Sequence, residues 1–184
     1  RKAITLKPDL AEAHNNLGVI LKDLGRLKEA EASCRKAITL KPEYAEAHNN
    51  LGVILQKLIR LEEAEESCRK AITLKPDLAE AHNNLGNTLK EQGRLEETMS
   101  SYIKAIELNP HLFECHQNLI DLLTTYTPQK RTKNLIVQVN QEINEIYFKE
   151  KNSGVILDDK IIQLFYKFTS IIKKCDLKIE TDLS

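Results

Sequence analysis

Apolar residues along most of the chain recur with the period of an α-helix, and the pattern forms pairs of helices. Residues 10–24 and 27–40 each carry an apolar stripe at the i, i+3, i+4 and i+7 spacing, which places side chains on one helix face. The stripes are His14, Leu17, Gly18 and Leu21 in the first segment, and Ala30, Cys34, Ala37 and Ile38 in the second. Lys41-Pro42 ends the pair, because proline lacks an amide hydrogen and its ring clashes with the preceding turn.

This two-helix pattern repeats every 34 residues. The stretch AEAHNNLG occupies Ala11–Gly18 and returns unchanged at Ala45–Gly52 and Ala79–Gly86. The same interval separates Pro8, Pro42, Pro76 and Pro110, and also Leu17, Leu51, Leu85 and Leu119. Units therefore start at residues 11, 45, 79 and 113, with a partial repeat at 1–10 and a degenerate repeat from 113. One helical hairpin buries little apolar surface alone, so we predict that the units stack into an all-α, right-handed α-solenoid.

Three local features of the repeat carry structural expectations. Gly18 and Ala30 are expected where the two helices of a unit approach most closely, because larger side chains would separate the axes. Ile59 occupies the turn position that Gly25 and Gly93 hold in the neighbouring units; a left-handed turn there would strain it by about 1 kcal/mol or more. The starts of the first helices resemble capping boxes, at Asp9-x-x-Glu12, Glu43-x-x-Glu46 and Asp77-x-x-Glu80.

The repeat resembles the tetratricopeptide repeat, a 34-residue helix-turn-helix unit. The matching positions are Leu17, Gly18, Ala30, Ala37 and Pro42; Leu51, Gly52, Ala64, Ala71 and Pro76; and Leu85, Gly86, Tyr102, Ala105 and Pro110. The departures are consistent from unit to unit: His14, His48, His82 and His116 replace the first aromatic residue of the family pattern, Leu21, Leu55 and Leu89 replace the second, and Cys34 and Cys68 replace the third. The resemblance covers residues 1–126.

The composition narrows the classes of partner. The chain has 184 residues, and its 27 basic and 27 acidic residues give no net charge, which argues against a nucleic-acid partner. No segment reaches the roughly 20 apolar residues of a membrane span, so we expect no membrane partner. The first residue, Arg1, falls inside the repeat pattern, so the true N-terminus is expected to be missing and a targeting signal stays open. The four cysteines form no secreted disulfide pattern, which favours an intracellular, cytoplasmic protein.

The repeat pattern ends after Tyr126, and residues 127–184 have another composition. Residues 133–148 read as one helix and 158–174 as a second, separated by Asn152-Ser153-Gly154. Two interpretations remain open for this segment. It is either a helical cap over the last repeat or the start of a further domain.

The repeated histidines and cysteines are interpreted as packing residues. Equivalent histidines in adjacent units are expected about 10 Å apart, whereas a zinc ion needs its nitrogen ligands at about 2.0–2.1 Å. We therefore expect no metal, and the imidazoles should bond to backbone or side-chain partners. Cys34 and Cys68 are read as small buried residues, and Cys115 and Cys175 show no cue to reactivity. With no catalytic constellation, we expect no enzyme activity and no cofactor.

The face of the first helix opposite its apolar stripe carries the candidate binding residues. The resemblance implies that the first helices line a concave groove, so this face would point into it. The predicted peptide-binding residues are Asn16, Asn50, Asn84 and Asn118, with Val19, Val53, Asn87, Asp121, Glu12, Glu46 and Glu80 beside them. An asparagine offers a donor and an acceptor that match one peptide group. The row resembles the asparagine ladder of the O-linked N-acetylglucosamine transferase superhelix, although local solvation or bonds between repeats would also explain it.

The sequence thus predicts a protein-interaction scaffold that holds an extended peptide or a partner helix in this groove. The alternative is a substrate-recruiting arm of a larger transferase, of glycosyltransferase or sulfotransferase type, whose catalytic domain lies outside this chain. End-to-end self-association is a third option, because the partial repeat leaves an uncovered edge.

Overall fold

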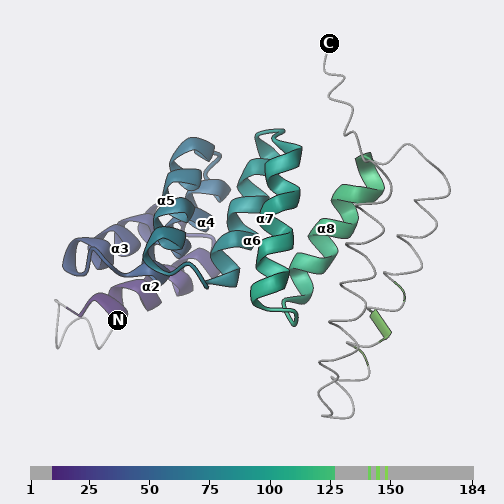
Figure 1. Cartoon of the computed structure of the whole chain (residues 1–184). Helices are drawn as coiled ribbons and strands as arrows, with labels where there is room; N and C mark the ends of the chain where they lie inside the picture. Colours follow the sequence, from purple (N-terminus) through teal and green to yellow (C-terminus); the bar gives the residue numbers. More distant parts are fainter. Residues whose placement is uncertain (1–9, 127–140, 142–143, 146–147, 149–184) are drawn as a thin grey trace. The chain divides into compact units, whose positions relative to one another are not determined.

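The computed structural model describes residues 10–126 together with residues 141, 144, 145 and 148 (Figure 1). This part of the chain is helical, without strands. Its helices are α2 (Ala11–Asp23), α3 (Leu27–Leu40), α4 (Ala45–Lys57), α5 (Leu61–Leu74), α6 (Ala79–Glu91), α7 (Leu95–Leu108) and α8 (Phe113–Tyr126). The chain divides into two compact units, Arg1–Ser101 and Tyr102–Ser184, with the boundary inside α7.

The predicted fold class, an all-α solenoid of 34-residue repeats, is confirmed. The expected first helix at 10–24 is α2, which is one residue shorter at each end, and the expected second helix at 27–40 is α3. The pair α4/α5 repeats α2/α3 at the same interval. Of the predicted helices of the C-terminal segment, only residues 141, 144, 145 and 148 are described, and they are helical as expected for the helix at 133–148. The rest of that segment, residues 1–9 of the partial repeat at 1–10, and Cys175 lie outside the described residues.

The two helices of a unit meet at a glycine, as predicted. A Cβ atom added to Gly18 would lie 2.5 Å from Cys34 Sγ and 3.3 Å from the Ala30 carbonyl oxygen. Gly52 repeats this geometry, with Cys68 Sγ at 2.5 Å. Cys34 and Cys68 are fully buried, so the cysteine sulfur fills the space that the glycine leaves. The predicted packing role of these cysteines is confirmed.

Neighbouring repeats stack mainly through the second helix of one repeat and the first helix of the next, α3 against α4 and α5 against α6. α4 also packs against α2 and α6, and these contacts are more extensive than any between α3 and α5. α4 is therefore buried on several sides: Ala47 and Ile54 are inaccessible to solvent although they lie off the predicted apolar stripe. Because the first helices lie closer together than the second helices, this array curves with the first helices on its inner side.

Arginine and glutamate side chains connect the second helices of neighbouring repeats. Arg60, which precedes α5, donates to both carboxylate oxygens of Glu31 on α3 at 2.8 and 2.9 Å, and Arg35 reaches Glu63 at 3.2 Å. One repeat further on, Arg94 binds Glu65 at 2.7 Å. We call the set Glu31, Arg35, Arg60 and Glu63, with its copy Glu65, Arg69, Arg94 and Glu97, the outer seam.

The turns between the two helices of a unit use the left-handed backbone conformation. Gly25 and Gly93 have φ angles of 72° and 76°, and Ile59 has a φ of 60° at the equivalent position. The left-handed conformation expected at Ile59 is therefore present. Its side chain is 81% exposed, so the repeat gains little packing in return for the strained conformation.

The predicted capping boxes are wrong. The residues that precede α2, α4 and α6 are Leu10, Tyr44 and Leu78, and none of them makes a side-chain cap hydrogen bond. Glu43 instead sits inside a turn that the Tyr44 amide closes by donating to the Lys41 carbonyl oxygen at 3.1 Å. Leu78 and Lys75 form the same turn one repeat later, also at 3.1 Å. The proline turn thus places Glu43 and Asp77 before the helix start rather than at its cap.

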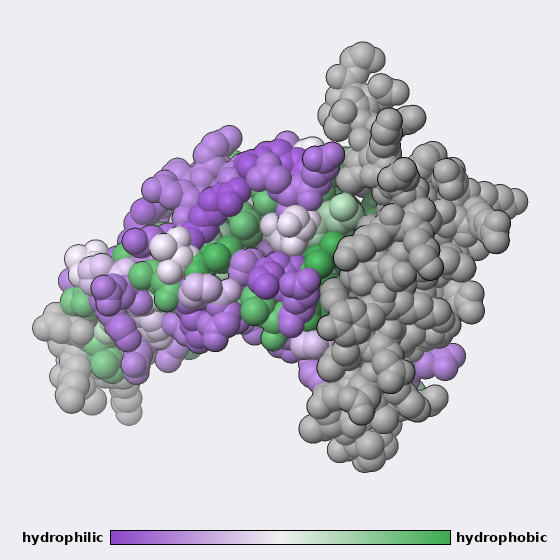
Figure 2. Space-filling view, in the orientation of Figure 1, coloured by the Kyte–Doolittle hydropathy of each residue, from purple (hydrophilic) through white to green (hydrophobic). Residues whose placement is uncertain are grey.

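The surface of the described repeats is mostly hydrophilic in Figure 2, with a band of apolar side chains between the polar ones. In the second compact unit, α8 buries Cys115, Leu119 and Ile120. Ile120 takes the position where the other 34-residue repeats have glycine. No helix in the described ranges is long and apolar enough to cross a bilayer.

Candidate peptide-binding surface

The predicted binding row lies on the first helices of the first unit, on their partly accessible inner face. Glu12, Asn16 and Glu80 are exposed. The other row residues on these helices are half-buried: Val19, Glu46, Asn50, Val53, Asn84 and Asn87. Asn118 and Asp121 lie on α8 in the second unit, half-buried and exposed respectively. The row is thus open enough to meet a ligand, but its asparagines also make contacts within the protein.

The second asparagine of each AEAHNNLG stretch binds the first asparagine of the preceding repeat. Asn50 Nδ2 donates to Asn15 Oδ1 at 2.9 Å, and Asn84 Nδ2 donates to Asn49 Oδ1, also at 2.9 Å. We call these two hydrogen bonds the inner seam. They fix the plane of the Asn50 and Asn84 amides, because each amide is held by one of its N–H groups.

The first asparagines form a buried row that sequence reasoning missed. Asn15, Asn49 and Asn83 are only 5%, 9% and 3% exposed. A buried amide needs hydrogen-bond partners, and the inner seam supplies one to Asn15 and one to Asn49. A signal was available in Ala47 and Ile54, which are seven residues apart off the main stripe and therefore mark a second buried face.

Tyr44 lies beside the inner seam at the start of α4. Burial and the negative charges of Glu12 and Glu46 raise the pKa of its hydroxyl, and a hydrogen bond from Asn15 partly offsets this. The Lys41 ammonium lies 4.9 Å from the centre of the Tyr44 ring, a cation–π distance. An aromatic ring, carboxylates and amides therefore converge at this end of the row.

Two further contacts lie near the row, one within the repeat at 45–78 and one between α4 and α6. Lys75 Nζ lies 3.0 Å from Glu46 Oε1. A hydrogen bond from the backbone amide of Glu46 itself and another from Lys75 lower the pKa of the Glu46 carboxyl. Gln56 donates to Glu91 at 2.7 Å. Glu46 is therefore partly neutralised, whereas Glu12 and Glu80 form no ion pair in the described part of the chain.

The repeated histidines close the turns between units. The Nε2 atoms of His48, His82 and His116 lie 3.0, 3.1 and 2.9 Å from the carbonyl oxygens of Pro42, Pro76 and Pro110. Because a carbonyl oxygen can only accept, each imidazole carries its proton on Nε2. The predicted backbone partner of the histidines is confirmed, and no cluster of three potential metal ligands occurs in the described ranges.

The described cysteines are not suited to nucleophilic chemistry. Burial raises the pKa of the Cys34 thiol to about 11 and those of Cys68 and Cys115 to about 12. A thiol with such a pKa is protonated near neutral pH and is a poor nucleophile. The Cys115 thiol instead donates to the Tyr102 carbonyl oxygen at 3.3 Å.

The repeat geometry agrees with a comparison to known families. The family model of the tetratricopeptide repeat matches residues 11–44, 45–78 and 79–112, which is more than half of the chain. The chain therefore belongs to the tetratricopeptide repeat family. These repeats are typically non-catalytic interaction modules, so the class of protein defined here is a protein-interaction scaffold. No curated protein matches the chain significantly.

Solved structures share the fold at low sequence identity. The first tetratricopeptide domain of Spaghetti, bound to an HSP90 peptide, is 22% identical with a TM-score of 0.60, over 63% of this chain and 92% of that one. A double mutant of MamA is 20% identical with a TM-score of 0.66, over 82% of each chain. The O-GlcNAc transferase of Thermobaculum terrenum is 25% identical with a TM-score of 0.65, over 69% of this chain. This chain spans only 25% of that transferase.

Proposed function

We propose that this protein is a non-enzymatic scaffold that binds an extended peptide or a partner helix along the inner face of α2, α4 and α6. The observation that carries the proposal is the row of accessible amides, Asn16, Asn50 and Asn84, at intervals of 34 residues on that face. Asn118 continues the row in the sequence. Val19 and Val53 beside the amides add apolar contact to the polar ladder.

The inner seam orients the Asn50 and Asn84 amides and leaves part of their hydrogen-bonding groups available to a guest peptide. An asparagine side chain has two N–H groups and two acceptor positions. The seam uses one N–H of Asn50 and one of Asn84, which leaves an oriented acceptor and a second N–H on each. A fixed amide loses little side-chain entropy on binding, so a peptide group of the guest would be held at a reduced cost.

The charges of the row define the class of guest. Glu12 and Glu80 are exposed acids, Glu46 is balanced by Lys75, and the row has no pair of basic side chains that could hold a terminal carboxylate. An acidic peptide tail would meet repulsion in this groove. A neutral or basic extended guest fits the proposal best.

Replacement of both ladder residues tests the proposal. Peptides selected on the wild-type protein should bind Asn50→Ala/Asn84→Ala about tenfold more weakly, because each lost hydrogen bond contributes about 0.5–1.5 kcal/mol. Isothermal titration calorimetry with the same peptides gives the dissociation constants. Unchanged affinity would reject the ladder.

The inner seam offers a matched control. Asn15→Ala/Asn49→Ala removes the same two hydrogen bonds between repeats but leaves the Asn50 and Asn84 side chains on the groove face. This control should lose stability yet keep most of its peptide affinity. If it loses as much affinity as the ladder variant, the asparagines act on repeat stacking and not on the guest.

A second candidate function is the substrate-recruiting arm of a larger transferase. The likeness to the Thermobaculum terrenum transferase favours it, because this chain spans a quarter of that enzyme. The complete reading frame tests this proposal directly. A catalytic transferase domain in the same frame would support the arm, and a frame without one would reject it.

A further inference from the structure

Tyr44 differs from its equivalents in the other repeats. The residue before the first helix is elsewhere a leucine, at Leu10, Leu78 and Leu112. The backbone does not explain the difference, because Tyr44 has φ −89° and ψ 88° and Leu78 has φ −76° and ψ 90°. Both side chains are half-buried. Since leucine fills the same place in the fold, the hydroxyl group of Tyr44 is an addition to the common repeat.

This hydroxyl group lies among members of the predicted binding row. Burial raises its pKa, the charges of Glu12 and Glu46 raise it further, and a hydrogen bond from Asn15 partly offsets this. A phenol with a raised pKa keeps its proton near neutral pH and remains a hydrogen-bond donor. Within the described part of the chain, no side chain or carbonyl accepts that hydrogen. Tyr44 therefore offers one unused O–H group beside the inner seam.

A chain of hydrogen bonds connects this O–H group to the amide ladder. Asn50 Nδ2 donates to Asn15 Oδ1 at 2.9 Å, and Asn15 in turn donates to the Tyr44 hydroxyl. Donation runs in one direction, which strengthens the last donor of the chain. At the next junction the chain stops at its asparagine, because a leucine cannot continue it. A carbonyl group of a guest peptide can serve as the next acceptor after Tyr44.

Tyr44 also changes the charges at this junction. Lys75 pairs with Glu46 at 3.0 Å, whereas the equivalent Lys41 lies 4.9 Å from the centre of the Tyr44 ring. Glu12, the equivalent of Glu46, forms no ion pair in the described part of the chain. The junction thus combines a phenol donor with an open carboxylate, which disfavours an acidic guest residue at this point.

These groups match the main chain of an extended peptide. An extended chain displays N–H and C=O groups along its length, whereas the carbonyl groups inside a helix are bonded to the helix's own amides. We propose that Tyr44 is a guest-binding residue: its hydroxyl donates to a main-chain carbonyl of an extended peptide and sets the register of that peptide at the junction between the repeats at 11–44 and 45–78. This inference rests on the proposed function and selects the extended peptide over the partner helix.

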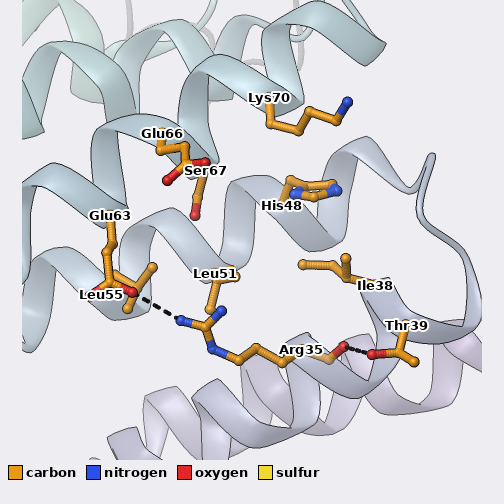
Figure 3. Close-up of a pocket in the computed structure, with 10 residues that line it drawn as sticks. All are labelled: Arg35, Ile38, Thr39, His48, Leu51, Leu55, Glu63, Glu66, Ser67 and Lys70. Carbon is orange, nitrogen blue, oxygen red and sulfur yellow. Dashed lines mark hydrogen bonds and ion pairs between the residues drawn. The ribbon is translucent and has the colours of Figure 1, made fainter.

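The outer side of the same junction supplies a control surface. A pocket of about 360 Å³ lies there between α3, α4 and α5 (Figure 3), and most of its lining is polar. The ion pair between Arg35 and Glu63 spans one end, and Leu51 and Leu55 belong to the core, at 4% and 1% exposure. Lys70 lines this pocket, is exposed and forms no ion pair within the described ranges. Lys70→Ala therefore alters the surface away from the groove.

Tyr44→Phe removes only the hydroxyl group. Peptides selected on the wild type should bind this variant about three- to tenfold more weakly in isothermal titration calorimetry, as expected for one hydrogen bond. Lys70→Ala should bind them as the wild type does. If Tyr44→Phe keeps full affinity while Asn50→Ala/Asn84→Ala loses it, the ladder stands and this inference is overturned. A wild-type protein that selects no peptide overturns both.

Transfer of the tyrosine tests the register. The side chains around Tyr44 recur 34 residues later around Leu78, as Glu46, Asn49 and Glu80. Tyr44→Leu/Leu78→Tyr should recover most of the affinity lost in Tyr44→Leu and move the peptide by one repeat. A nitroxide on one end of a short peptide should then broaden amide NMR signals 34 positions later than in the wild type. Absent recovery, or recovery without this displacement, overturns the proposal, because a purely structural tyrosine would not move the guest.

The conformation of the bound peptide gives an independent test. Backbone carbon-13 chemical shifts of a labelled peptide should be those of an extended chain in the complex. Helical shifts would overturn the choice of guest whatever the affinities are.

Discussion

The inner and outer seams join the same pairs of repeats by different chemistry. On the inner side, partly buried amides bond across the junction at 2.9 Å without any net charge. On the outer side, arginines and glutamates that range from partly buried to exposed make a network whose side chains are between 16% and 51% accessible. The strength of the amide hydrogen bonds depends on the exact placement of the two side chains and does not change with salt or pH. The strength of the ion pairs changes with both.

The two seams therefore contribute to repeat stacking in different ways. A buried amide without its partner is costly, so the inner seam defines which residue of one repeat lies opposite which residue of the next. An exposed ion pair tolerates displacement and contributes little, so the outer seam adds attraction without demanding one register. The alignment of adjacent repeats is therefore fixed on the groove face, and the opposite face tolerates small shifts between repeats.

The largest effect is expected at the contact within a repeat, on which both seams depend. Gly52→Ala places a methyl group 2.5 Å from Cys68 Sγ, and overpacking of this kind should lower the free energy of unfolding by about 2 kcal/mol in urea denaturation. In a Cys68→Ala background the sulfur is absent, so the same substitution should cost much less. Equal losses in both backgrounds would show that the sulfur is not the obstacle.

Disruption of the inner seam should cause the next largest loss of unfolding free energy, and this loss should not depend on salt. Asn49→Ala leaves Asn84 without its bond across the junction and should reduce the unfolding free energy by about 1.5 kcal/mol, at low and high ionic strength alike. Asn16→Ala, at an exposed position, should change it by less than about 0.5 kcal/mol. A strong dependence of the Asn49→Ala loss on salt would contradict the distinction between the seams.

Disruption of the outer seam should cause a smaller loss of unfolding free energy, and this loss should decrease as salt is added. Glu65 contacts Arg69 at 2.8 Å and Arg94 at 2.7 Å, so Glu65→Gln should lower the unfolding free energy by about 0.5–1 kcal/mol at low ionic strength. In about 1 M sodium chloride the Debye length shrinks to about 3 Å and the loss should nearly disappear. A loss that persists in salt would mean that Glu65 acts through packing.

The smallest effect is the pH dependence of the outer seam. Partial burial alone would raise the pKa of Glu31, but hydrogen bonds from Arg35 and Arg60 outweigh it and hold the pKa below the ordinary value of 4.5. The pKa of Glu65 is lowered in the same way by Arg69 and Arg94. A carboxyl with a depressed pKa stabilises the fold above its ordinary pKa, and the contribution is lost as the pH falls through the folded-state pKa.

Acid titration of stability measures this contribution. Between pH 6 and pH 3, the wild type should lose more unfolding free energy than Glu31→Gln/Glu65→Gln, by less than about 1 kcal/mol. Parallel curves for the two proteins would show that these carboxylates do not stabilise the native state.

Much of the fold follows from the sequence because the physical signals repeat in register. The helix bounds, the glycine contacts of Gly18 and Gly52, the histidine bonds to backbone and the strained Ile59 were all predictable from local chemistry. The capping boxes failed because the proline turn, which closes between Lys41 and Tyr44, competes with an acidic cap for the same backbone. Local spacing alone does not reveal which of the two prevails.

The candidate site was predictable only in part. The accessible row of Asn16, Asn50 and Asn84 follows from helical geometry within one repeat. Its bonds to Asn15 and Asn49 do not, because they depend on how far one repeat is shifted against the next. The pocket beside Leu51 and Leu55 likewise arises from the spacing between α3 and α5, which no single repeat encodes.

The identical amide bonds at a spacing of 35 residues make this array modular in evolution. Removal of residues 45–78, or insertion of another copy, would bring an equivalent asparagine into the same place beside Asn15. Unequal recombination within the gene can therefore lengthen or shorten the scaffold by whole units, with the junction chemistry unchanged.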